Sequence, residues 1–275
     1  MTKFFLDQHG CAKNQVDGEL LIARLCALGL EQTFEPSEAD LIIVNSCGFI
    51  ESAKKESLEA VCSARREYPG AKILLAGCLA QRYADDLKEA LPEADGIFGN
   101  GDLSALSDFV KPLLAGKRPV LAPEQKGVCC GDRSMMLSYR GSAYVKITEG
   151  CSNHCSFCAI PIIRGELRSR NADEIIDEIK KLLSQGVFEL NLIGQDLAAY
   201  GTGEGDNVLG QGRAELPELA SDGTNLGTKK TSALAELLKR ISCLKGNFWV
   251  RLLYIHPDHF NEDIIPVIQK DNRIL

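Results

Sequence analysis

The most informative stretch of this chain is residues 149–158, which have the sequence EGCSNHCSFC. Its three cysteines, Cys151, Cys155 and Cys158, can wrap one metal cluster from a single loop, and iron–sulfur clusters are held by such thiolates. A cubane cluster takes four ligands, so one iron is left for a ligand from outside the protein. A zinc knuckle that uses His154 is the alternative, and the position of this histidine between two cysteines on a tight loop disfavours it.

The sequence on either side of this stretch predicts strands and helices in alternation, the pattern of a (β/α) barrel. A complete barrel of eight units takes about 250 residues. The units found here number about three, so we expect a partial barrel that is incomplete at the C-terminus. The expected strands are residues 144–147, 188–193 and 248–254, and the expected helices are residues 171–185, 232–242 and 261–271.

The first part of the chain predicts an α/β domain with a parallel sheet, because short apolar runs alternate with amphipathic segments. Its buried strands are continuous apolar runs, as both faces of a parallel sheet are covered by helices. The expected strands are residues 4–6, 41–44, 73–76 and 97–98, and the expected helices are residues 14–29, 50–68, 81–91 and 102–114.

Three further cysteines, Cys11, Cys47 and Cys78, each follow one of these strands and are each next to a glycine. They are spaced by about one strand–helix–strand unit, roughly 30 residues. They are therefore expected at the same carboxyl edge of the sheet, where open α/β folds bind ligands. Three thiolates without a fourth protein ligand suit an iron–sulfur cluster with one open iron. The alternatives are three small apolar side chains at buried strand ends, or a zinc site completed by His9.

The composition sets limits on the class of protein. The chain has 275 residues, of which 45% are hydrophobic and 25% charged, and this balance argues against disorder. No apolar run reaches the roughly 18 residues that a membrane helix needs. The odd number of cysteines, 11, disfavours a disulfide framework and favours soft-metal or thiol chemistry in a reducing, cytoplasmic setting. The net charge of −7 weakly favours a protein or small-molecule substrate over a nucleic acid.

The loop at 149–158 resembles the signature of the radical S-adenosylmethionine enzymes, and the two three-cysteine sets together resemble the methylthiotransferase family among them. This resemblance implies two [4Fe-4S] clusters, with S-adenosylmethionine as methyl donor and radical source. It also implies a methylthiotransferase N-terminal domain at 1–118, a linker at 119–140, and a partial radical SAM core at 141–275 with a flexible insertion at 202–231. The implied ligands of the auxiliary cluster are Cys11, Cys47 and Cys78, and those of the cluster that binds S-adenosylmethionine are Cys151, Cys155 and Cys158, with Phe157 beside the cofactor.

Local motifs separate the branches of this family. Residues 10–17, 45–53, 146–151 and 160–165 resemble the RimO type, which modifies an aspartate of ribosomal protein number twelve of the small subunit. The implied partners are that protein, an electron donor of flavodoxin or ferredoxin type and a sulfur source, with no membrane. The alternatives are a transfer-RNA adenosine methylthiotransferase, and a non-catalytic iron–sulfur protein or inactive fragment. The sequence identifies no catalytic residue.

Two groups of residues have no clear assignment. Arg164, Arg168 and Arg170 form a basic stretch after the cysteine loop, and a solvated face is the first expectation, with contact to S-adenosylmethionine or an acidic substrate as the alternative. Cys129 and Cys130 form a vicinal pair in the linker, for which a ligand or redox role is the less favoured interpretation.

Overall fold

The computed structural model describes residues 1–133, 135–209 and 231–275. The chain forms two compact units. The first unit consists of Met1–Arg140 and Glu149–Glu166, and the second consists of Gly141–Thr148 and Leu167–Leu275. The cysteine loop therefore belongs to the same unit as the N-terminal sheet. The boundaries 1–118, 119–140 and 141–275 stay a prediction, and most of the predicted insertion, residues 210–230, lies outside the described residues.

The first unit is built on a fully parallel sheet, which confirms the predicted fold class. Its strand order is β2-β1-β3-β4-β5-β6. The strands are β1 (Lys3–Gln8), β2 (Glu31–Gln32), β3 (Leu41–Ser46), β4 (Lys72–Gly77), β5 (Gly96–Gly99) and β6 (Val120–Leu121). The sequence did not predict β2 and β6, because two-residue strands at the sheet edges carry no detectable periodicity.

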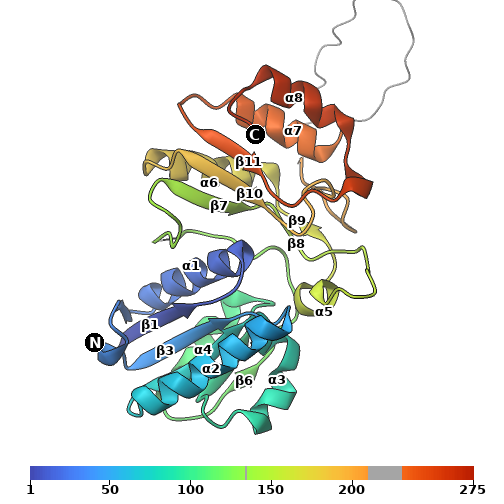
Figure 1. The fold of residues 1–275 in the computed structure, drawn as a ribbon. Helices are drawn as coiled ribbons and strands as arrows, with labels where there is room; N and C mark the ends of the chain where they lie inside the picture. Colours follow the sequence, from blue (N-terminus) through green and yellow to red (C-terminus); the bar gives the residue numbers. More distant parts are fainter. Residues whose placement is uncertain (134, 210–230) are drawn as a thin grey trace, which may run out of the picture. The chain divides into compact units, whose positions relative to one another are not determined.

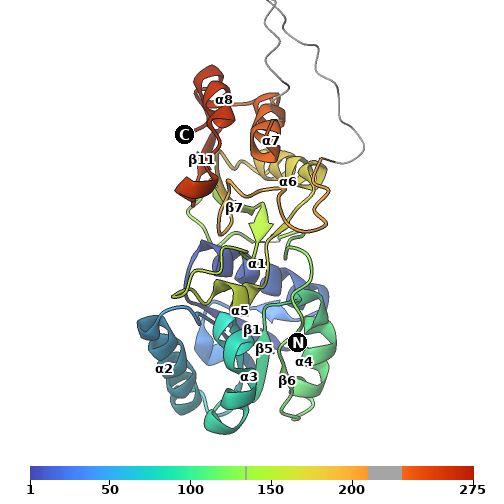
Figure 2. The ribbon, with the colours of Figure 1, turned by 90° about the vertical axis from the view of Figure 1, so that its right-hand side faces the viewer.

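Four helices cover the two faces of this sheet (Figure 1). Helices α1 and α4 pack against each other over one face, and α2 and α3 cover the other (Figure 2). The alternation of side chains along β4 shows the two layers, since Leu75 packs with the α2 and α3 residues while Leu74 lies near α4. The helices are α1 (Ala12–Ala27), α2 (Glu51–Glu67), α3 (Cys78–Ala90) and α4 (Leu106–Leu114).

Helix boundaries differ from the prediction near Cys78 and after the cysteine loop. Helix α3 begins at Cys78, three residues earlier than expected, because Gly77 makes the turn with a φ of +94°. A short helix, α5 (Ile160–Arg164), follows the cysteine loop and was not predicted. At five residues it is too short for the helical period to show in the sequence.

The second unit contains a three-stranded parallel sheet in the order β11-β10-β7. Helix α6 packs against α7 and α7 against α8 on one side of this sheet (Figure 1). The last residues continue the sheet, because the Val250 N–H donates to the Arg273 carbonyl and Leu275 N–H to the Val250 carbonyl, both at 2.7 Å. The elements are β7 (Ser142–Lys146), β10 (Glu189–Ile193), β11 (Trp249–Leu252), α6 (Ala172–Ser184), α7 (Ala233–Ser242) and α8 (Ile265–Lys270).

This arrangement agrees with the predicted partial barrel of strand–helix units. The small strands β8 (Thr148–Glu149) and β9 (Arg168–Ser169) form a separate two-stranded sheet. Among the described residues, no helix is both long and apolar enough to cross a membrane.

Candidate metal centre

The first candidate site lies at the carboxyl edge of the six-stranded sheet. Strands β2 and β3 lie on opposite sides of β1, so the order in which strands are added to the sheet reverses between β1 and β3. Ligands of open α/β sheets bind outside the strand ends at such a point. Cys11 follows β1, Cys47 follows β3 and Cys78 follows β4, so all three cysteines leave the sheet at this edge, as the sequence predicts.

Each cysteine of this set has a different local environment. Cys11 is exposed and is the N-cap residue of α1, whereas Cys78 is the first residue of α3 and only 7% exposed. Cys47 is half-buried, and its backbone N–H donates to the Ser57 hydroxyl at 3.1 Å. Two of the three thiols therefore lie at helix N-termini, where the helix dipole favours negative charge.

Glycines bring these three segments into close contact. A Cβ on Gly48 would lie 2.7 Å from the Cys78 carbonyl oxygen, and a Cβ on Gly10 would lie 3.0 Å from the Cys47 Cβ. The segment of Cys47 therefore packs against those of both other cysteines. No larger residue fits at Gly48 without moving the backbone of Cys78.

Asn14 ties the strand-end loops together from the first turn of α1. Its Nδ2 donates to the carbonyl oxygens of His9 at 2.9 Å and of Asn45 and Ser46 at 3.1 Å each. Asn14 is 1% exposed, and the Cys78 thiol is 3.8 Å from its Oδ1. Asn14 lies in the motif at 10–17, but the sequence does not predict this role, because Asn45 and Ser46 are 31 and 32 residues away.

The Cys78 sulfur accepts hydrogen bonds from two buried side chains. Arg164 Nη2 lies 3.1 Å and Asn100 Nδ2 3.3 Å from this sulfur. The same guanidinium pairs with Asp17 Oδ2 at 2.9 Å and with Glu149 Oε1 at 2.6 Å. Ala159 and Ile163, which precede Arg164, pack against Cys78 and complete its apolar surroundings.

The expectation of a solvated face is therefore wrong for Arg164 and Arg170, which are 4% and 6% exposed. Arg170 donates from Nη1 to the Lys146 carbonyl at 2.9 Å and pairs with Glu178 at 2.5 Å. Arginine is rarely buried unless paired, and each of these guanidinium groups has a carboxylate partner. The sequence does not reveal such pairing, because the partners come from separate segments.

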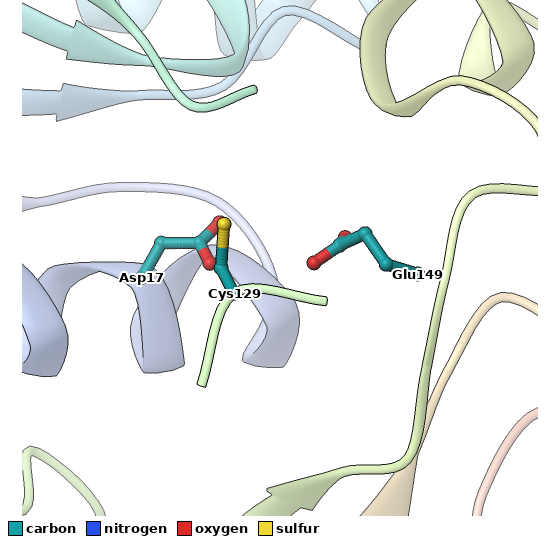
Figure 3. Close-up of side chains that lie close together, drawn as sticks. All are labelled: Asp17, Cys129 and Glu149. Atoms are coloured by element: carbon teal, nitrogen blue, oxygen red, sulfur yellow. The ribbon is translucent and has the colours of Figure 1, made fainter. Parts of the chain in front are cut away.

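Three potential ligand atoms meet beside Arg164. The carboxylate oxygens of Asp17 and Glu149 and the sulfur of Cys129 lie within 4.8 Å of one another. Figure 3 shows the Cys129 sulfur next to the Asp17 carboxylate, with Glu149 pointing toward both. The Arg164 guanidinium already neutralises both carboxylates, so a metal ion at this point would have to displace it. This arrangement brings Cys129 into the surroundings of Cys78 without making a separate cation site.

Charge interactions at this edge depend on burial. Burial raises the pKa of the Cys78 thiol, and Arg164 partly opposes that rise. Burial alone would lower the pKa of Arg164, but its interactions with Cys78, Asp17 and Glu149 outweigh the effect of burial and hold the pKa above its usual value. Arg164 is thus a fixed positive charge against the sulfur of Cys78.

The second candidate set lies on the loop that precedes α5. Cys151, Cys155 and Cys158 are all half-buried. The loop is closed by the Cys151 N–H, which donates to the Gly165 carbonyl at 3.0 Å, and by the Cys158 N–H, which donates to the Cys155 carbonyl at 2.9 Å. Phe157 is 87% exposed, which leaves its predicted position beside the cofactor a prediction.

The donor chemistry of both sets fits iron–sulfur clusters. Each set offers three thiols, and soft thiolate ligands favour such clusters. The two histidines considered as zinc ligands lie against carboxylates. His9 pairs with Asp7 at 3.1 Å and Glu56 at 3.2 Å, and His154 Nε2 lies 3.3 Å from Glu166.

Known families match both parts of the chain. Residues 3–99 match the model of the uncharacterized protein family UPF0004, and residues 145–273 match that of the radical SAM superfamily. The chain is 54% identical to the ribosomal protein uS12 methylthiotransferase RimO of Treponema denticola, over 98% of this chain and 56% of that protein. The protein of the same name from Syntrophomonas wolfei is 38% identical, over 97% of this chain and 56% of its own length.

Solved structures show the same fold. The radical S-adenosylmethionine methyltransferase TsrM from Kitasatospora setae superposes with a TM-score of 0.60 at 14% identity, covering 98% of this chain and 57% of that one. The chain spans about half the length of the curated relatives that it matches. The radical SAM match implies S-adenosylmethionine and a [4Fe-4S] cluster as cofactors. The chain belongs to the radical SAM superfamily and, within it, to the RimO-type methylthiotransferase family.

Proposed function

We propose that this chain carries out the reaction named for its relatives, the transfer of a methylthio group to ribosomal protein uS12. The target is an aspartate side chain, as the resemblance to the RimO type implies. The observation that carries the proposal is the pair of three-cysteine sets within a chain that is 54% identical to a uS12 methylthiotransferase over nearly its whole length. The ribosomal substrate implies action in the cytoplasm.

The proposal assigns two [4Fe-4S] clusters to the chain. Cys151, Cys155 and Cys158 would hold the cluster that binds S-adenosylmethionine, and Cys11, Cys47 and Cys78 would hold the auxiliary one. When bound, these groups and S-adenosylmethionine supply the radical that abstracts a substrate hydrogen and the sulfur that replaces it. An electron donor of flavodoxin or ferredoxin type and a sulfur source belong to the same proposal.

The residues around the first set are suited to hold a cluster. Gly48 and Gly10 keep the backbone segments that carry the three cysteines close together. Asn14 holds the residue after β1 and the end of β3 together, because its side chain donates to three backbone carbonyl oxygens there. Ile163 excludes water from Cys78, since both residues are buried in the same apolar cluster.

Iron and sulfide analysis after anaerobic reconstitution tests the ligand assignment. Two cubanes predict about eight irons per chain, and about four in each of the triple variants Cys151→Ala/Cys155→Ala/Cys158→Ala and Cys11→Ala/Cys47→Ala/Cys78→Ala. The control variant is Cys62→Ala, because this half-buried thiol on α2 belongs to neither set. About four irons in the unaltered chain, all lost with the first triple variant, would refute the auxiliary site.

The substrate is tested separately by mass spectrometry. The reconstituted chain is incubated with S-adenosylmethionine, sulfide and dithionite, and with either uS12 or transfer RNA. A methylthio group on an aspartate of uS12 is expected. Modification of transfer-RNA adenosine alone would favour the runner-up function. Bound clusters with no cleavage of S-adenosylmethionine would identify the non-catalytic alternative.

A further inference from the structure

The sulfur of Cys78, one of the six predicted ligands, receives hydrogen bonds from two side chains. Two N–H donors point at it, from Arg164 at 3.1 Å and from Asn100 at 3.3 Å. Both donor side chains are buried, with Arg164 4% and Asn100 5% exposed. Hydrogen bonds in such surroundings are stronger electrostatically than in water.

Both donors are held in place by contacts of their own. Arg164 pairs with Asp17 and Glu149, which fix the plane of its guanidinium group. Asn100 Nδ2 also lies 3.4 Å from Asp17 Oδ2, while no hydrogen-bond partner is found for its Oδ1 among the described residues. The amide is therefore oriented with its donor end toward the sulfur and Asp17.

These donors have a clear consequence for a cluster bound through Cys78. Reduction adds one electron to the cluster and increases the negative charge on its sulfurs. N–H donors and a fixed positive charge stabilise that added charge, so they raise the reduction potential. We infer that Arg164 and Asn100 are positioning residues that set the reduction potential of the auxiliary cluster through the Cys78 sulfur. This inference rests on the proposed function, since Cys78 must be a ligand of that cluster.

The test uses the variant Cys151→Ala/Cys155→Ala/Cys158→Ala, in which only the auxiliary cluster remains. Asn100→Leu and Arg164→Lys are introduced separately into this background after anaerobic reconstitution. Asn100→Leu removes one donor without changing any charge, and Arg164→Lys keeps the charge but loses the planar group that reaches the sulfur and both carboxylates. The midpoint potential is measured by redox titration with electron paramagnetic resonance.

Each variant is expected to lower the equilibrium constant for one-electron reduction by about threefold to tenfold. A tenfold decrease shifts the midpoint potential by about 59 mV toward more negative values. The matched controls are Asn191→Leu and Arg133→Lys. Asn191 is 6% exposed and donates to the Ser142 hydroxyl, and the buried Arg133 pairs with Glu19. Neither control is expected to move the potential.

The results distinguish a failure of the role inferred for Arg164 and Asn100 from a failure of the auxiliary-cluster assignment. A cluster whose potential is unchanged in both Asn100→Leu and Arg164→Lys would overturn the inference and leave the ligand assignment standing. A background variant that binds no iron would overturn the auxiliary site and the inference together. If Arg164→Lys fails to fold, Asn100→Leu alone decides, because this substitution leaves no charge unpaired.

Discussion

The substitution Gly48→Ala tests whether the close backbone packing at the sheet edge is needed for the first cysteine set. The new Cβ would lie 2.7 Å from the Cys78 carbonyl oxygen and 2.8 Å from both the Cys78 carbonyl carbon and the Leu79 Cα. All three atoms are backbone, so no side chain can rotate away. Overpacking costs typically about 1–3 kcal/mol, and the upper half of this range, about 2–3 kcal/mol, is expected here.

The matched control is Gly70→Ala. Nothing lies within 4 Å of the position of its Cβ, so no steric cost arises. Replacing such a glycine by alanine stabilises a protein by about 0.4–1 kcal/mol, because it reduces the conformational entropy of the unfolded chain, or leaves the stability unchanged. Local unfolding free energies of β3 and β4 are measured by amide hydrogen exchange on the cluster-free protein.

A second readout connects this packing to the site. Because the clash pushes Cys78 away from Cys47, Gly48→Ala is expected to lose the auxiliary irons while Gly70→Ala keeps them. Equal unfolding free energies and equal iron contents in the two variants would refute the reasoning from steric contact.

Three further predictions concern other contacts. Glu19→Gln is expected to destabilise the first unit by about 3–5 kcal/mol, measured by chemical denaturation, because it removes the negative charge that lies 2.6 Å from the buried Arg133 guanidinium. Hydrogen bonding to Asp7 raises the pKa of His9. The contribution of protonated His9 to the stability of the fold is therefore complete below its unfolded pKa of about 6.5, and it is lost as the pH rises through the folded pKa. NMR titration of cluster-free Asp7→Asn should give a lower His9 pKa than the parent. Arg273→Ala removes hydrogen bonds to three backbone carbonyls, those of Ser242 at the end of α7 and of Leu244 and Gly246 after it. The unfolding free energy of the second unit should fall by about 2–3 kcal/mol, and a change below about 0.5 kcal/mol would contradict this.

Much of the fold could be predicted because buried parallel strands are short apolar runs. The apolar runs at 41–44 and 73–76 predict β3 (Leu41–Ser46) and β4 (Lys72–Gly77), and with them the edge at which Cys47 and Cys78 emerge. The two-residue β2 and the five-residue α5 were missed, since neither is long enough to show a period. The local pattern of apolar residues thus predicts the order of strands and helices and places the cysteines after the strands.

The surroundings of the cysteines could not be predicted in the same way. Arg164 was expected on a solvated face, whereas the folded chain buries it against Asp17, Cys78 and Glu149. Two of these partners lie 86 and 15 residues away in the sequence. A charged side chain is buried only where it has partners, and these can lie far away in the sequence. The periodicity of apolar residues does not reveal such partners.

The position of Arg164 also gives a physical reason why the compact unit that holds the first site includes residues 149–166. Arg164 ends the helix that follows the second cysteine set, and its guanidinium lies 3.1 Å from the sulfur of Cys78 in the first. A polypeptide that ended at residue 118 would keep Cys11, Cys47 and Cys78 but would lack Arg164 and Glu149. Asp17 would then lose the guanidinium that pairs with it at 2.9 Å, and removing one partner of a buried ion pair is costly. The compact unit joins Glu149–Glu166 to the N-terminal sheet, and the charge balance around Cys78 gives the physical reason for including that segment.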